Sequence, residues 1–324
     1  MYRHSRLAAI LGCAMTLSIV GCATNGGVAP IAGPAASALV QTGGNGPGWI
    51  HAGNIVYHVP HYMVTRWAAR PNTSGILFTY RNGSVLTTPT AYLILWGYKK
   101  YGDANHVAKL LKDYLKVAGG SGHNNIYTQY YQDISSVKTY ITNPKKQRGG
   151  VWDDETDPVP TNPTDQQVAA ESLAGVAHFG YDANASYIVA TPHLHSSAGF
   201  GTSFCAYHSA TVQGSNVVSY TNLPYQPDAG PSCGANFILP PKDETGTDEG
   251  VTIVEGHEYG ESVTDPNPPS GWYNNTAGEI GDACAWAQGA PPDNVENVKF
   301  GKKSYTAQPM YSNASESCVQ SYSP

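Results

Sequence analysis

Residues 251–263 read VTIVEGHEYGESV, and we predict that they form a helix. In a helix, His257 and Glu261 lie four residues apart on one face, which is the spacing that two ligands of one metal ion require. Glu258 is then a neighbouring carboxylate, free to act on a metal-bound water. The alternative is an acidic helix whose carboxylates face solvent.

Local preferences around this segment are mixed. Three glycines within residues 250–260 and the β-branched run at 251–254 each disfavour a helix interior by up to about 1 kcal/mol. A Thr-Asp pair at 247–248 offers an N-cap, and the prolines within 266–269 offer a stop. A strand would place the two ligand side chains about 13 Å apart, too far to share an ion. We therefore prefer the helix.

A zinc peptidase also needs a third protein ligand, which leaves a fourth position for water or substrate. Residues 278–284 read GEIGDAC and provide Glu279 and Asp282 as candidates. The order of these residues resembles that of the thermolysin-like gluzincins, with Glu261 in place of the second His. The resemblance implies that Glu279 is the third ligand and that Asp282 holds His257 through a hydrogen bond. Here the gap between Glu279 and Asp282 is three residues rather than four, so either one remains a candidate ligand.

The expected donor set is one imidazole and two carboxylates. Such a set is harder and more anionic than a site with two imidazoles. Zinc is favoured, and other divalent ions stay open.

The start of the chain indicates targeting. Residues 1–21 combine a basic start with an apolar stretch too short to span a membrane, which predicts a signal peptide. Residues 19–22 resemble a bacterial lipobox with Cys22 as the lipidated residue, and ordinary cleavage after Ala23 is the alternative. Residues 22–48 are rich in Gly, Ala and Pro and predict a flexible tether. We expect an outer-membrane or cell-surface lipoprotein, or a secreted protein, that contacts membrane only through Cys22.

The amino-acid composition also limits which classes of protein are expected. The chain has 18 Lys+Arg and 24 Asp+Glu with no basic run, so a nucleic-acid partner is not expected. Charged residues make up only 13%, whereas 35 Gly, 23 Pro and 22 Tyr suit a loop-rich exported protein. Outside the leader the four cysteines predict two disulfides. Their order suggests Cys205–Cys233 and Cys284–Cys318, although three connectivities are possible.

Residues 49–324 are predicted to form a single catalytic-type α/β domain. Strands are expected at 91–97 and 186–191, and helices at 104–117 and 164–179, the latter with a capping-box start. The polar, proline-rich residues 145–163 predict a surface loop. The expected fold is a mixed sheet with flanking helices and a metalloprotease-like active-site helix, rich in loops.

Other histidines offer weaker sites. In a strand, His193 and His195 would point the same way, as metal-binding pairs do, although two exposed loop histidines are more common. His208 lies beside Cys205, and a structural hydrogen bond is expected of it. His61 has no partner pattern. Residues 199–203, GFGTS, have the small residues of a tight turn but not the strand-to-helix context of a nucleophile elbow, so a serine hydrolase using His208 or His195 has the least support.

From about Tyr57 to its end, the chain resembles a bacterial relative of the exordium, or phosphate-induced, protein family. The resemblance is carried by NGSVLT at 82–87, YLILWG at 92–97, FCAYH at 204–208, DEG at 248–250, HEYGE at 257–261, GWY at 271–273, GEIGDAC at 278–284 and QPMYSN at 308–313. The plant members are extracellular, growth-associated proteins without a settled activity. The resemblance therefore implies export and overall fold, and the chemistry depends on the site.

The resulting hypothesis is an exported zinc-dependent metallopeptidase that acts on a peptide or protein. Glu258 would take a proton from a metal-bound water as the water attacks a peptide carbonyl. Tyr259 or Tyr273 would stabilise the oxyanion. The alternative is a non-catalytic cell-envelope or wall-associated binding protein whose acidic site is structural, binds calcium or holds no metal.

Overall fold

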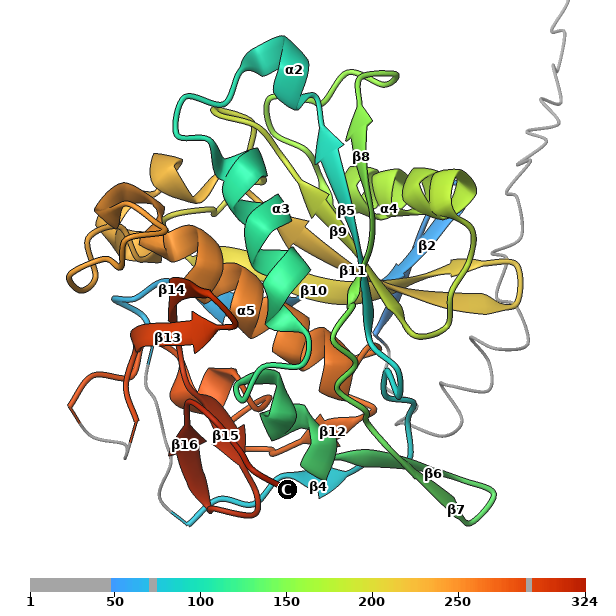
Figure 1. The fold of residues 1–324 in the computed structure, drawn as a ribbon. Helices are drawn as coiled ribbons and strands as arrows, with labels where there is room; N and C mark the ends of the chain where they lie inside the picture. The colour runs from blue at the N-terminus through green and yellow to red at the C-terminus, as the bar shows by residue number, and fades with distance from the viewer. Residues whose placement is uncertain (1–47, 70–74, 290–292) are drawn as a thin grey trace, which may run out of the picture.

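A large mixed β-sheet forms the centre of the computed structural model, which describes residues 48–69, 75–289 and 293–324 (Figure 1). The strand order is β1-β2-β10-β11-β9-β5-β8, and β3 also pairs with β10. Strands β11, β9, β5 and β8 run parallel, whereas β10 is antiparallel to β11, β2 and β3. The strands are β1 Trp49–Ala52, β2 Ile55–His58, β3 His61–Val64, β5 Thr90–Trp96, β8 Arg148–Asp154, β9 Ala185–Ala190, β10 Phe204–Gln213 and β11 Asn216–Leu223.

Helices cover both faces of this sheet. Alternate residues of β5 point to opposite sides, so Leu93 packs with helices α3 (Val107–Ala118) and α5 (Glu249–Thr264). Ile94 packs instead with α4 (Asp165–Phe179). Figure 1 shows α3 and α4 on either side of β5. The predicted mixed α/β architecture is confirmed.

Small hairpins and loops fill the rest of the described chain and make it loop-rich, as predicted. The short elements are α2 Tyr98–Tyr101, η1 Asn124–Gln129, η2 Gln226–Asp228, η3 Gly230–Cys233, η4 Gly246–Asp248 and η5 Asp282–Cys284. The strand pairs outside the main sheet are β4 Thr79–Tyr80 with β12 Trp272–Tyr273, β6 Tyr131–Ile134 with β7 Val137–Tyr140, β13 Glu296–Phe300 with β14 Lys303–Ala307, and β15 Met310–Ser312 with β16 Ser317–Val319.

The local predictions succeed where the sequence signal is strong. Thr164 and Gln167 form the predicted capping box of α4. The prediction of a loop over residues 145–163 is wrong for Arg148–Asp154, which form β8. This strand lies at the sheet edge beside β5 and is mostly half-buried, so its polar and glycine-rich composition is tolerated there.

Helix α5 is buried along its whole length although 11 of its 16 residues are polar or glycine. It lies between the main sheet, α3 and the C-terminal strand β14. A Cβ on Gly256 would lie 2.8 Å from the hydroxyl of Tyr114, and one on Gly260 would lie 2.7 Å from the hydroxyl of Tyr127. The glycines that weaken the helix on its own therefore allow its neighbours to approach closely.

Both predicted disulfides are present. Cys205–Cys233 joins the start of β10 to η3, ahead of α5, with 5.5 Å between the Cα atoms. Cys284–Cys318 joins η5 to β16, with 5.8 Å between the Cα atoms. The second bridge fixes the loop that carries Asp282 to the C-terminal hairpin.

The predicted leader lies outside the part of the chain that the structure describes, as does the tether up to residue 47. Within the described residues, no helix is both long and apolar enough to cross a bilayer.

Candidate metal centre

Helix α5 carries His257, Glu258 and Glu261, all of which are buried. His257 and Glu261 face each other across one helical turn, with 3.1 Å between Nε2 and Oε2. This is the geometry that the spacing predicted.

Asp282, the first residue of η5, joins this pair. Its Oδ1 lies 3.8 Å from Nε2 of His257, and its backbone N–H donates to Oε1 of Glu261 at 2.9 Å. Ligand atoms of His257, Glu261 and Asp282 all lie within 4.8 Å of one another. The three side chains can therefore close on one ion.

Gly281 permits this approach of the loop to the helix. A Cβ at this position would lie 2.7 Å from Oε1 of Glu261 and 2.8 Å from Nδ1 of His257. The loop is held by two further hydrogen bonds, from Tyr311 N–H to the Ile280 carbonyl and from Gln308 Nε2 to the Gly281 carbonyl. Its position is thus fixed by the C-terminal strands.

The two candidate third ligands, Asp282 and Glu279, face different histidines. Asp282 approaches Nε2 of His257, the nitrogen that also faces Glu261. A residue that orients a ligating imidazole binds its other nitrogen, so the position of Asp282 suits a ligand better than an orienting group. Glu279 faces elsewhere, with its carboxylate between His208 and His61.

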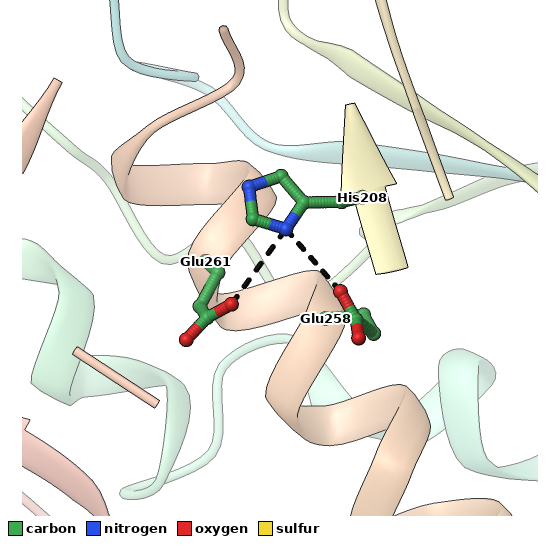
Figure 2. A group of neighbouring side chains, drawn as sticks. All are labelled: His208, Glu258 and Glu261. Atoms are coloured by element: carbon green, nitrogen blue, oxygen red, sulfur yellow. Dashed lines mark hydrogen bonds and ion pairs between the residues drawn. The ribbon is translucent and has the colours of Figure 1, made fainter. Parts of the chain in front are cut away.

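His208, on β10, forms a second cluster with the helix. Its Nδ1 lies 3.2 Å from Oε2 of Glu258 and 3.6 Å from Oε2 of Glu261. Figure 2 shows this nitrogen facing both carboxylates, with the other ring nitrogen turned away from them. His208, Glu258 and Glu261 are themselves a group that could hold an ion. The expected structural hydrogen bond of His208 is thus made to the proposed catalytic base.

His61 joins the same cluster from β3. It is the cross-strand partner of His208, and its Nδ1 lies 3.1 Å from Oε2 of Glu279. No sequence pattern indicates this role, because the pairing of β3 with β10 brings together residues 147 positions apart (208 − 61). Only the strand register reveals it.

The charges in the site depend on one another. Burial alone would raise the pKa of Glu279, but the neighbouring His208 and His61 outweigh it and lower this pKa to about 2. Burial alone would lower the pKa of His208 and of His61, but Glu279 raises both above the usual value, with Glu258 adding to the effect on His208. Glu279 is therefore an anion whose charge favours the protonated form of both imidazoles.

Burial also raises the pKa of other acidic side chains in and near the site. Burial and then the charge of Glu279 raise the pKa of Glu261, and burial and then Glu261 raise that of Asp282, both well above the usual range. Burial, followed by the charge of Glu258, likewise raises the pKa of Glu255. A cation between Glu261 and Asp282 would allow both to be ionised at neutral pH.

Unpaired buried atoms support such a cation. Among the described residues, neither ring nitrogen of His257 has a hydrogen-bond partner, and Oε1 of Glu258 has none. Leaving a buried polar group unpaired costs about 1–3 kcal/mol, and an ion held by His257, Glu261 and Asp282 would remove this cost at Nε2 of His257. The mixture of nitrogen and carboxylate donors fits zinc better than calcium, which prefers six to eight oxygens.

The two tyrosines considered for oxyanion stabilisation also separate. The Tyr259 hydroxyl donates to Oε1 of Gln147 in the core. Tyr273 packs edge-on against His61 with 5.9 Å between ring centres, and it is half-buried. Burial and then the charges of Glu279 and Asp282 raise its pKa, which places its hydroxyl within their field. Tyr273 is the better candidate.

The rival histidine pair does not converge. Strand β9 ends at Ala190, and the following turn places Leu194 in the left-handed region with φ of 61°. Nδ1 of His193 binds Oδ1 of Asp228 at 2.5 Å, whereas the His195 ring packs on Tyr101 with 4.0 Å between ring centres. The alternation expected of a strand is absent here, so the two rings take different partners.

Comparisons of the chain with protein-family models, with curated proteins and with solved structures find no match. The resemblances to the exordium family and to the gluzincins stay predictions.

Proposed function

We propose that this protein is a zinc-dependent metallopeptidase acting on peptides or proteins. His257, Glu261 and Asp282 would hold the metal, and Glu258 would be the general base. The observation that supports this most is the convergence of three buried or partly buried ligand side chains from α5 and the start of η5. Helix α5 would then be the active-site helix, as in metalloproteases.

Each protein group has a distinct task in the proposed reaction. Bound zinc would supply Lewis acidity and a water of lowered pKa. Glu258 is the residue after His257 on α5. It takes a proton from the water that attacks the peptide carbonyl and returns this proton to the leaving amine. Tyr273 donates a hydrogen bond to the developing oxyanion from the side of His61. Substrate would reach the site past Asp282 and His61, which keep 29% and 22% of their side chains exposed.

Metal analysis of the purified full chain tests the first part. We expect one zinc ion per chain, cleavage of fluorescently labelled casein, loss of cleavage after chelation and recovery on adding zinc. Zinc without cleavage, calcium in its place, or no metal at all would reject the peptidase.

A second candidate function is a non-catalytic cell-envelope binding protein of exordium type with a structural ion. The complete burial of His257 and Glu258 favours it, because a structural metal site needs no open position. Export through the predicted leader is shared by both candidates. Mass analysis of the N-terminal peptide would test lipidation at Cys22, with Cys22→Ser as the control.

A further inference from the structure

His208 lies between Glu258 and Glu279, which belong to different parts of the chain, and its Nδ1 also lies 3.6 Å from Oε2 of Glu261. It is fully buried on β10, which packs against α5. Its Nδ1 makes a hydrogen bond of 3.2 Å with Oε2 of Glu258, and its Nε2 lies 3.3 Å from Oε1 of Glu279. Since a carboxylate only accepts hydrogen bonds, the contact with Glu258 requires a proton on Nδ1.

Glu279 is fixed in turn from its other side. Its Oε2 lies 3.1 Å from Nδ1 of His61, the cross-strand partner of His208. Imidazole and carboxylate thus alternate from the partly exposed His61, through Glu279 and His208, to the buried Glu258. The sheet register and the loop before η5 together fix the order.

We infer that His208 is the positioning residue of the base Glu258, and that Glu279 and His61 hold His208 rather than bind metal. This inference rests on the proposed peptidase function. Glu258 needs such a donor because only Oε2 is held, while Oε1 has no hydrogen-bond partner among the described residues. Holding one oxygen leaves the other in a defined place to receive a proton.

The competing arrangement is a metal held by His208 itself, together with Glu258 and Glu261. Their ligand atoms lie close enough for this. It would require a bare Nδ1 lone pair and would remove Glu258 from service as a base. The two arrangements therefore differ in whether Nδ1 of His208 carries a proton.

Two matched variants of His208 test the role of each ring nitrogen separately. The amide nitrogen of Asn lies near the place of Nδ1, and that of Gln near the place of Nε2. With zinc-loaded full chain and labelled casein, we expect His208→Gln to lower kcat about 100-fold, the scale of a misplaced general base. KM and zinc content should stay unchanged, and His208→Asn should keep kcat within about tenfold of the wild type. Equal losses in both variants, or loss of zinc in either, would overturn the inference.

A direct measurement does not depend on turnover. Nitrogen NMR of zinc-loaded chain labelled at histidine, with the His208 signals assigned by their loss in His208→Asn, reports the state of each ring nitrogen. We expect a proton on Nδ1. A metal-bound, unprotonated Nδ1 would overturn the inference while leaving a metal centre intact. Absence of bound zinc or of casein cleavage in the wild type would instead reject the proposed function, and the inference with it.

Discussion

The backbone N–H of Asp282 donates to Oε1 of Glu261, while Oε2 of the same carboxylate faces His257. Glu261 therefore joins the loop to the helix and faces the imidazole at the same time. Replacement of Glu261 should affect both roles. We expect Glu261→Ala to abolish stoichiometric zinc binding and to lower the melting temperature of the metal-free protein.

Glu261→Gln provides the control, because its amide oxygen can still accept from Asp282. This variant should keep the metal-free melting temperature but bind zinc at least about tenfold more weakly. Chelator competition measures the affinity, and calorimetry the melting temperature. Full zinc affinity in Glu261→Ala would contradict the assignment of this residue as a ligand.

Asp282 and Glu279 should differ in what their removal does. Asp282→Ala removes a proposed ligand and should lose stoichiometric zinc. Glu279→Gln should retain zinc but lose turnover, since Glu279 faces His208 and His61. Zinc content after gel filtration, compared with casein cleavage, checks both. The reverse result would make Glu279 the ligand.

Gly281→Ala tests the close approach of the loop to the helix. The added Cβ would press on Oε1 of Glu261 and Nδ1 of His257, so we expect a destabilisation of about 1–3 kcal/mol and weaker zinc binding. Gly122→Ala is a matched control, because its Cβ would meet only Ser321 at an ordinary 3.4 Å. Urea denaturation gives the free energy of unfolding. An unchanged value for Gly281→Ala would show that the loop can move.

Glu171, which is not part of the metal centre, should make the free energy of unfolding depend on pH. Burial, and then its hydrogen bond with Asp154, raise its pKa to about 9. Because the folded protein holds this proton above pH 4.5 and the unfolded chain does not, the group lowers stability as pH rises from 4.5 towards 9, by up to about 1.4 kcal/mol per unit. Glu171→Gln should remove this slope, measured by urea denaturation between pH 5 and pH 8.

The exposed Glu316 supplies the matched control for that experiment. Glu316→Gln should leave the slope of unfolding free energy against pH as in the wild type. A slope that persists in Glu171→Gln would assign it to other groups.

Sequence reasoning predicted the parts of the fold that have local causes. The capping box of α4, the spacing of His257 and Glu261, and both cysteine pairs depend on neighbouring residues or on order along the chain. The helical state of α5 was harder to predict, because glycines disfavour a helix. Their presence is explained only by the close contacts that α5 makes with α3 and η1. Helix propensity alone does not include those contacts.

The remaining site residues have no local signal. His208 and His61 meet only because β3 pairs with β10, and the loop carrying Glu279 is hydrogen-bonded to the C-terminal strand β15 through Ile280 and Tyr311. The partner choice of Glu279 and Asp282 likewise depends on tertiary geometry rather than on their spacing. A motif search finds α5 and its acids but not the imidazoles that face them.

Strand β3, at the start of the described domain, carries one end of the site. A chain shortened to begin at residue 75 would retain every residue of the His-Glu-x-x-Glu and Gly-Glu-Ile-Gly-Asp motifs but would lose His61. Its Glu279 would have an imidazole on one side only, and the edge of β10 that β3 covers would be bare. Functional studies therefore need the chain from its first strand, however complete the motif in a shorter fragment.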